Sequence, residues 1–251
     1  FNINTLNKHS NHWFIDSNTI INVIYTLMEP YLFRFSANIK TDIFLKDPET
    51  SQIGTAIINQ SIDLINEIGF EEFNFKKLSA RIGTTEATIY RYFENKHKLL
   101  LYITSWYWCW VEYQLVLHNT NITDPQVQLK NTIKVLATPT AQHYADVNLQ
   151  NLFNIICSES CKSYLIKNVD DLNKYGVYFN YKKIVSIISD IIKLINPTYM
   201  YPHMLVTTVI EGIHNQKYFA EHLPALTDIT EDPEYLINFY YQLIIDTIKK
   251  A

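Results

Sequence analysis

The sequence predicts an all-α protein, with an N-terminal helix-turn-helix domain of three helices followed by a C-terminal helical ligand-binding and dimerisation domain. Only 5 of the 251 residues are glycine and 8 are proline, less than half of the usual combined share of about 12%. Apolar residues recur at three- and four-residue steps along most of the chain. Hydrophobic residues make up 47% of the sequence, which is enough for a sizeable core. A β-sandwich or a nucleotide-binding α/β fold needs many more turn residues, so both are excluded.

Residues 1–49 are rich in asparagine and are expected to form a loosely ordered extension, or an addition upstream of the working protein. One helix is expected in it, over about 18–28, with Asp16 or Ser17 as its cap and its end before Pro30. The apolar run 20–35 contains Asn22, Glu29, Pro30 and Arg34, so it is neither a membrane span nor a signal-peptide core.

The cysteines and the lack of a membrane signal indicate a cytoplasmic protein. Cys109, Cys157 and Cys161 cannot all pair, and the last two lie one helical turn apart. A reducing compartment is therefore expected, with no membrane partner.

Residues 50–97 predict three helices and the start of a fourth. Isoleucines from Ile53 to Ile68 recur at helical spacing up to Gly69, which can end the first helix. Asn74 can cap a second helix to about Ile82, and Gly83 supplies a left-handed turn. Thr85 can cap a short third helix, and Asn95 or Lys96 opens a long one to about His118.

The remaining residues, 98–251, predict further helices. Asp124 and Pro125 provide an N-cap and a proline in the first helical position for a helix to about Ala137. The other helices are expected at Asp146 to Ser158, Asp170 to Ile195, Pro202 to His222 and Pro233 to Lys250.

A local basic segment falls on the second and third helices. The whole chain has 21 Lys/Arg and 25 Asp/Glu, a net charge of −4, yet residues 74–98 hold six Lys/Arg and only two Asp/Glu. Two short helices joined at a glycine turn are typical of the helix-turn-helix, whose second helix enters the major groove of DNA. A helical hairpin packed in a core and a solvated charged face would look alike, so the shape alone leaves DNA binding open.

Residues 52–100 resemble the DNA-binding region of the TetR family of bacterial transcriptional regulators. The motif residues at that family's spacings are Gly69-Phe70, Asn74, Leu78-Ser79, Gly83, Thr85, Thr88-Ile89-Tyr90, Tyr92-Phe93, Lys96 and Leu99. The resemblance implies a ligand-responsive DNA-binding regulator that binds a palindromic operator as a homodimer. A repressor is the expected form, and the sequence leaves activation open as the alternative. It implies no enzyme activity and no cofactor. The partners expected are double-stranded DNA, a second copy and a small-molecule effector of unknown identity.

The resemblance also assigns DNA-contacting residues. Thr85 caps the recognition helix, Glu86, Ala87, Thr88 and Arg91 face bases, and Tyr90, Tyr92 and Lys96 hold phosphates. Lys76 and Lys77 flank these residues where phosphates would run. The sequence departs from the family at Thr84, usually apolar, at Ala87, often glycine, and at Glu86, which either reads a cytosine or turns away from the groove.

The last two predicted helices carry more apolar residues than one contact face needs, which favours a homodimer. These residues are Met204, Val206, Val209, Ile210, Ile213, Leu236, Phe239, Tyr240, Leu243, Ile244 and Ile248.

Aromatic residues of the C-terminal domain either fill its core or line a pocket for an apolar or planar ligand. The candidate ligand residues are Trp106, Trp110, Tyr113, His143, Phe153, Cys157 and Tyr178.

A different class of function rests on Glu211 and His214. Their Glu-x-x-His spacing occurs in di-metal helical oxidoreductases, which need two such motifs around one cavity. The second copy in the sequence, Glu94 and His97, falls in the helix-turn-helix region. The sequence therefore favours a polar contact for Glu211 and His214, and no metal site is expected.

Overall fold

The computed structural model describes residues 37–39, 43–139, 143–229 and 232–249, all within one compact unit from Ala37 to Ala251. The helix expected over 18–28 lies outside the described residues, as does most of the extension expected over 1–49.

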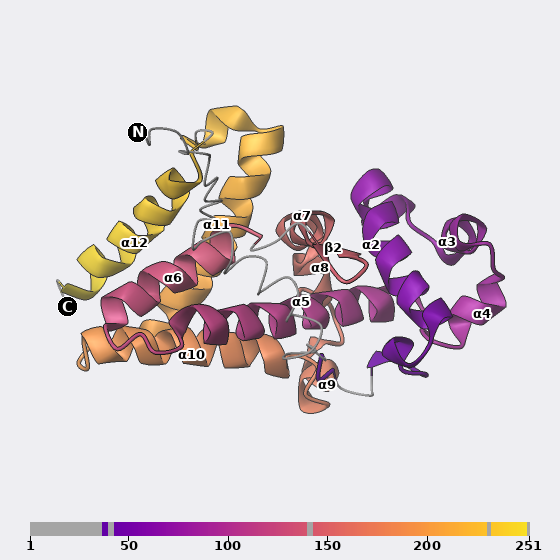
Figure 1. Ribbon diagram of the computed structural model, residues 1–251, viewed down its shortest axis with the longest axis horizontal. Helices are drawn as coiled ribbons and strands as arrows, with labels where there is room; N and C mark the ends of the chain where they lie inside the picture. The colour runs from indigo at the N-terminus through magenta and orange to yellow at the C-terminus, as the bar shows by residue number, and fades with distance from the viewer. Residues whose placement is uncertain (1–36, 40–42, 140–142, 230–231, 250–251) are drawn as a thin grey trace, which may run out of the picture. The chain divides into compact units, whose positions relative to one another are not determined.

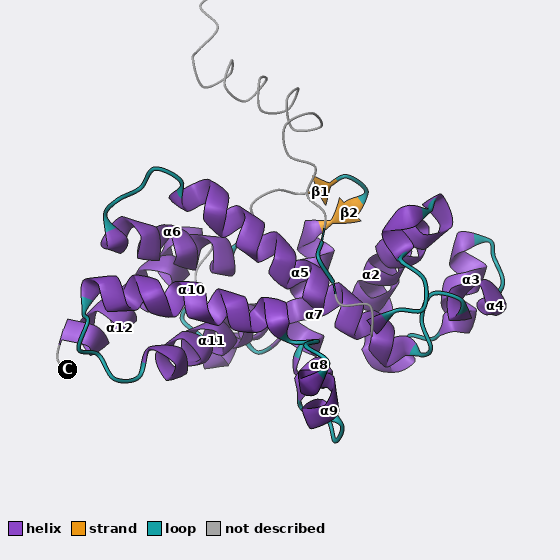
Figure 2. Cartoon of the chain, turned by 90° about the horizontal axis from the view of Figure 1, so that it is seen from below, coloured by secondary structure: helices purple, strands orange, loops and turns teal. Residues whose placement is uncertain are grey.

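The described chain is helical, as the sequence predicts, with one short hairpin (Figures 1 and 2). Its helices are α2 (Gln52–Glu72), α3 (Phe75–Ile82), α4 (Glu86–Tyr90), α5 (Lys96–Asn119), α6 (Pro125–Ala137), α7 (Leu149–Glu159), α8 (Cys161–Tyr164), α9 (Val169–Lys174), α10 (Phe179–Ile195), α11 (Pro202–His222) and α12 (Pro233–Lys249), with 3-10 turns η2 (Pro48–Thr50) and η3 (Pro224–Leu226). The hairpin strands are β1 (His143–Tyr144) and β2 (Val147–Asn148), which are antiparallel.

Two helices differ from the prediction. The helix expected from Asp146 begins at Leu149, because Asn148 accepts from the Asn151 N–H at 3.0 Å and caps it, while Asp146 lies in the turn of the hairpin. The helix expected over Asp170–Ile195 is split into α9 and α10. The break falls at Gly176, whose φ of 77° ends the helical path.

The helix α5 joins the N-terminal helices to the rest of the protein. Its 24 residues span about 36 Å at 1.5 Å per residue, and Figure 1 shows it running from α2 past α6 and α10. The central core forms where α5 packs on α6 and α10, and where α11 packs on α7 and α10. Because α2 packs on α3 and on α7, it too connects the two ends of the molecule.

None of the helices in the described part of the chain has both the length and the apolar run needed to cross a membrane.

Candidate DNA-binding surface and ligand cavities

The turn between α3 and α4 is built by local hydrogen bonds. The Asn74 side chain accepts from the Lys77 N–H at 2.9 Å, and the Thr85 hydroxyl accepts from the Thr88 N–H at 3.3 Å. Gly83 lies between them in the left-handed region, with φ 68° and ψ 35°, which a glycine adopts without strain. The caps expected at Asn74 and Thr85 and the turn expected at Gly83 are confirmed.

One face of the short helix α4 is buried against the protein, and the opposite face is exposed to solvent. Ile89 is fully buried, whereas Glu86, Ala87 and Arg91 are exposed and Thr88 is half-buried. The residues expected to face bases therefore reach the surface, as readout of base edges requires.

Tyr90 is packed on one side of its ring and exposed on the other. Its ring packs edge-on against Phe75, with 5.0 Å between ring centroids, while 49% of the residue stays exposed. The residue expected to hold a phosphate therefore reaches the surface.

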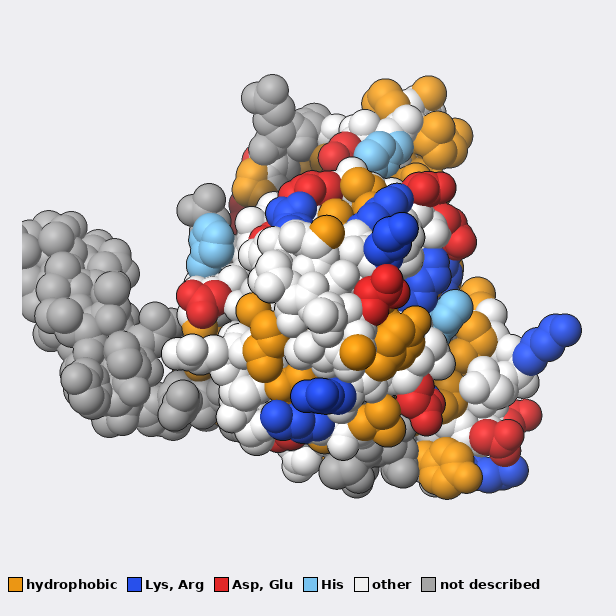
Figure 3. Space-filling view, turned by 90° about the vertical axis from the view of Figure 1, so that its right-hand side faces the viewer, with side chains coloured by type: hydrophobic (Ala, Val, Ile, Leu, Met, Phe, Trp, Pro, Cys, Tyr) orange, Lys and Arg blue, Asp and Glu red, His pale blue; other side chains and the backbone are white. Residues whose placement is uncertain are grey.

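The basic residues of α3 differ in how far their charges are paired with acidic residues. Arg81 donates to both Glu67 carboxylate oxygens and to Gln60, so its charge is paired. Lys77 donates to the backbone oxygen and carboxylate of Glu72 but remains exposed, and Lys76 is exposed. In the view of Figure 3, which faces the right-hand side of Figure 1, basic side chains lie among acidic and apolar ones rather than in one continuous patch.

Lys96 is committed to the protein itself. Its ammonium donates to the backbone oxygens of Phe70, Glu71 and Phe73 at 2.9, 3.0 and 3.1 Å, and lies 4.7 Å from the centre of the Phe70 ring. These carbonyls follow the break in α2 at Gly69. An ammonium has three donors, so none is left for a phosphate. The structure revises the phosphate contact implied for Lys96 to a cap on the end of α2.

Tyr92 is likewise turned inward. The residue is 2% exposed, its hydroxyl lies 2.8 Å from the Ser51 hydroxyl, and its backbone oxygen accepts from the Leu45 N–H. The hydrogen bond with Ser51 lowers the pKa of the Tyr92 phenol. The structure therefore revises the phosphate contact implied for Tyr92 to a bond that holds the start of α2 near α4.

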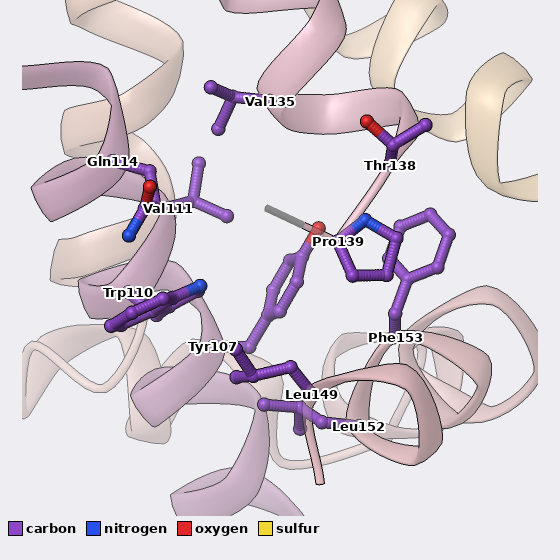
Figure 4. A pocket seen from close by; sticks show the side chains of 10 residues that line it. All are labelled: Tyr107, Trp110, Val111, Gln114, Val135, Thr138, Pro139, Leu149, Leu152 and Phe153. Atoms are coloured by element: carbon purple, nitrogen blue, oxygen red, sulfur yellow. The ribbon is translucent and has the colours of Figure 1, made fainter. Parts of the chain in front are cut away.

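The expected ligand residues do not gather in one cavity. Trp110 and Phe153 line a space of about 20 Å³ next to Tyr107, which holds about one water molecule. Figure 4 shows Tyr107 between Trp110 on one side and Pro139 and Phe153 on the other. The Tyr107 hydroxyl is buried and finds no hydrogen-bond partner among the described residues.

The other expected ligand residues are spread over the domain. Trp106 stacks on Trp110 with ring centroids 6.0 Å apart, and Tyr113 also packs on Trp110. Tyr178 lines a second small space, and His143 is exposed on the hairpin. Cys157, together with Phe153, lines a larger cavity of about 370 Å³ between α2, α7 and α11. The structure therefore distributes these seven residues over different parts of the domain rather than around one cavity.

Glu211 and His214 do not face a shared metal cavity. Glu211 accepts from the Tyr164 and Tyr181 hydroxyls at 2.8 and 3.2 Å, while both His214 ring nitrogens are buried without a partner. Throughout the described ranges, no three His, Cys, Asp or Glu side chains come together as metal ligands would. The polar contact that the sequence favours is confirmed for Glu211 and is wrong for His214, whose ring packs among apolar and aromatic side chains.

The helices α11 and α12 bury most of their apolar residues within the chain but leave a stripe exposed. Val206, Ile210, Ile244 and others are buried. The exposed apolar residues on these two helices are Met204 (68%), Tyr218 (36%), Tyr235 (49%), Phe239 (55%) and Leu243 (40%). Tyr235, Phe239 and Leu243 follow one another at four-residue steps on one face of α12.

Solved structures with the same fold include three regulators. AibR, in a complex with isovaleryl coenzyme A and operator DNA, is 16% identical over 75% of this chain and 96% of its own, with a TM-score of 0.54. FadR from Bacillus halodurans, a fatty acid degradation regulator, is 15% identical over 76% and 93%, with a TM-score of 0.53. KstR2 of Mycobacterium tuberculosis, a ketosteroid transcriptional regulator, is 11% identical over 86% and 98%, with a TM-score of 0.51.

At the level of sequence, no curated protein matches the chain. Residues 57–103 match the model of the bacterial regulatory proteins of the tetR family. This range runs from the second turn of α2 to the first third of α5 and contains the capped turn and the exposed face of α4. This segment of the chain is therefore a helix-turn-helix of the tetR-family type.

Proposed function

We propose that the protein is a ligand-responsive repressor that binds a palindromic operator as a homodimer and has no enzyme activity. In this proposal residues 50–97 read DNA, and residues 98–251 bind the effector and the second copy. The observation that carries the proposal is the exposed face of α4. The side chains of Glu86, Ala87 and Arg91 are open to solvent there, directly after the capped glycine turn. Support also comes from the fold, since AibR has it in a complex with both operator DNA and a small molecule.

The DNA contacts proposed fall into two groups. Glu86, Ala87, Thr88 and Arg91 read base edges, and Thr85 holds the helix that carries them. Lys76, Lys77 and Tyr90 hold the phosphates on either side, since all three are exposed. Phosphate contacts fix the register and base contacts give the specificity.

The stripe on α12, together with the exposed apolar residues of α11, supports the proposed homodimer. A second copy would cover Tyr235, Phe239 and Leu243, whose exposure costs free energy in water. Two readers related by a two-fold axis bind half-sites about 34–36 Å apart, one turn of DNA, or a multiple of it. An effector that moves α5 or α2 changes this separation and weakens binding.

The test is to incubate the full chain with fragments of its own genome at low salt, and to sequence those retained. An inverted repeat should be enriched, and binding should weaken steeply as salt rises, because phosphate contacts release counterions. If no duplex is retained even at low salt, the proposal is wrong. If single half-sites are enriched without a repeat, the dimeric reader is wrong.

A further inference from the structure

A cavity lined by both apolar and polar side chains lies between α2, α7 and α11. Its volume of about 370 Å³ falls within the range of small-molecule pockets, about 300–1,000 Å³. Its apolar part is made by Ile65, Pro139, Phe153 and Ile155, and its polar part includes Asn66, Gln150, Asn154 and Lys217.

Lys217 brings an uncompensated positive charge into this cavity. The residue is half-buried, and among the described residues its ammonium has no hydrogen bond or ion pair. Burial lowers the pKa of the Lys217 ammonium, as expected for a cation partly removed from water. Burial also raises the pKa of the neighbouring Cys157 thiol to about 12, so this thiol stays neutral and does not balance the charge.

The two carboxylates at the cavity are occupied or point outward. Glu159 accepts from the Phe70 N–H at 3.2 Å and pairs with Lys162 at 2.7 Å. Glu221 is exposed next to His222, 3.9 Å away. Neither lies within ion-pair distance of Lys217, so an anion from outside the protein would be the partner of its ammonium.

Amide side chains add hydrogen-bond donors along one wall. Gln150 donates to the Asn154 amide oxygen at 2.9 Å, and Asn154 donates to the Asn66 oxygen at 3.1 Å. The chain of bonds crosses from α7 to α2 and ends at Asn66, whose own NH₂ group makes no hydrogen bond to another described residue. These oriented amides place a donor on the same cavity as the Lys217 cation.

From this arrangement we propose that the cavity is the effector site, and that it takes an amphipathic organic anion. The carboxylate, phosphate or sulfonate of the ligand pairs with Lys217, and its apolar body lies on Ile65, Pro139 and Phe153. The release of DNA by this ligand rests on the proposed function. The binding of the ligand in the cavity does not.

The cavity also borders the point where α2 breaks before the reader. Gly69 and Glu159 both line it, and no atom lies within 4 Å of the place where a Gly69 Cβ would stand. Glu159 holds the N–H of Phe70, the residue after the break. A ligand next to Gly69 would therefore contact the segment after the break in α2, which leads into α3.

The binding test uses 1-anilinonaphthalene-8-sulfonate as the anionic probe and N-phenyl-1-naphthylamine, the same rings without the sulfonate, as the neutral one. Fluorescence titration should show that Lys217→Met weakens the anionic probe by about tenfold or more, the value of a charge-assisted contact. Lys217→Arg keeps the charge and should retain most of the affinity. Lys193→Met, which removes an exposed lysine of α10, should bind like the unaltered protein.

The neutral probe should bind the unaltered protein and Lys217→Met equally. Equal affinity of the two proteins for the anionic probe, or its failure to bind the unaltered protein, overturns the proposal. Thermal unfolding and far-UV circular dichroism of each variant check that the helices are intact, and Lys217→Arg checks this independently through retained binding.

A second measurement separates this proposal from the proposed function. Without probe, Lys217→Met should retain duplex DNA like the unaltered protein, and the anionic probe should release DNA only from the unaltered protein. Failure of the unaltered protein to bind DNA sinks the proposed function and leaves the titration as the test of the cavity. Lys217-dependent binding that leaves DNA affinity unchanged overturns the effector assignment.

Discussion

The ammonium group of Lys96 could bind either a phosphate or backbone carbonyl groups, because both are hydrogen-bond acceptors. An ammonium at the start of a helix beside a DNA reader suits a phosphate, but here it satisfies the three carbonyl groups after the break in α2. Buried carbonyl groups without partners cost free energy, and hydrogen bonds from a charged donor are the stronger ones. The charged side chain of Lys96 therefore caps the carbonyl groups at the end of α2.

Lys96→Ala should therefore lower the free energy of unfolding, by about 1.5–3 kcal/mol. Chemical denaturation at pH 7 measures this. The matched variant is Lys76→Ala, which removes an exposed lysine of α3. It should leave stability unchanged and weaken binding to all DNA sequences alike. If Lys96→Ala unfolds at the same denaturant concentration as the unaltered protein, the capping role is wrong.

Arg91 is exposed directly after α4 and makes no side-chain hydrogen bond or ion pair with another described residue. Arg91→Ala should relax specificity at one base pair by about 1–3 kcal/mol, because a bidentate guanidinium contact with guanine is lost. Binding to a set of operators with single base changes measures it. A uniform loss across the set would instead make Arg91 a phosphate contact.

His214 should make the protein less stable in mild acid. Its ring lies among Tyr107, Trp108 and Phe153 without a hydrogen-bond partner, and burial lowers its pKa from 6.5 to about 4. Between these two pH values the unfolded chain binds the proton and the folded chain does not. The free energy of unfolding should therefore decrease as the pH falls from 6.5 toward 4, and His214 should cause no loss of stability above pH 6.5.

The variant His214→Leu removes this proton and two unpaired buried nitrogens. Its free energy of unfolding should depend less on pH over that range, and at pH 7 it should be equal to or higher than that of the unaltered protein. Denaturant titrations at pH 7, 6, 5 and 4 give the comparison. The same slope in both proteins would contradict the burial of a neutral imidazole.

At the scale of elements, the start of α2 is fitted closely to η2. A Cβ at Gly54 would stand 2.7 Å from the Pro48 Cα, and Pro48 is itself buried. In an open helix Gly→Ala stabilises by up to about 1 kcal/mol, but here the methyl group meets backbone that cannot turn aside. The sign of the effect should therefore reverse.

Gly54→Ala should destabilise the protein by about 1–3 kcal/mol, the cost of overpacking a well-fitted site. Gly212→Ala is the matched variant, since its methyl group would meet only the end of the Tyr240 side chain, whose oxygen is 2.5 Å from the Cβ position. A side chain can shift where a backbone cannot, so Gly212→Ala should cost less. Thermal unfolding compares them, and a stabilised Gly54→Ala would contradict the packing of η2 on α2.

At the scale of the whole molecule, the exposed stripe on α12 is the basis of the proposed dimer. Leu243 is 40% exposed, so a charge there does not enter the core of the chain. Leu243→Asp should give monomers, and DNA affinity should fall because each monomer reads one half-site without the tethered second reader.

Sedimentation at micromolar concentration measures the oligomeric state. Asn238→Asp is the control, because it adds the same charge at an exposed position of α12 beside the stripe. It should remain a dimer, and both variants should keep their helical circular dichroism. An unaltered protein that sediments as a monomer would contradict the dimer and the palindromic operator together.

The sequence by itself determined the features that depend on neighbouring residues. The caps at Asn74, Thr85, Asn95 and Asp124 are hydrogen bonds to backbone N–H groups two or three residues ahead, so their residue types predict them. The same holds for the glycine turn and for the periodic apolar faces. The all-α class follows from the few glycines and prolines and from this periodicity, and the helix-turn-helix follows from the caps and the glycine turn.

Only the tertiary structure decided the features that join distant residues. Lys96 meets the end of α2, more than twenty residues earlier, and Tyr92 meets Ser51 across 41 positions. Helical periodicity says that Phe153 and Cys157 share a face of α7, but not that α2 and Lys217 of α11 close a cavity over it. Such contacts depend on how helices pack, and the period of one helix contains no information about which other helix it will meet.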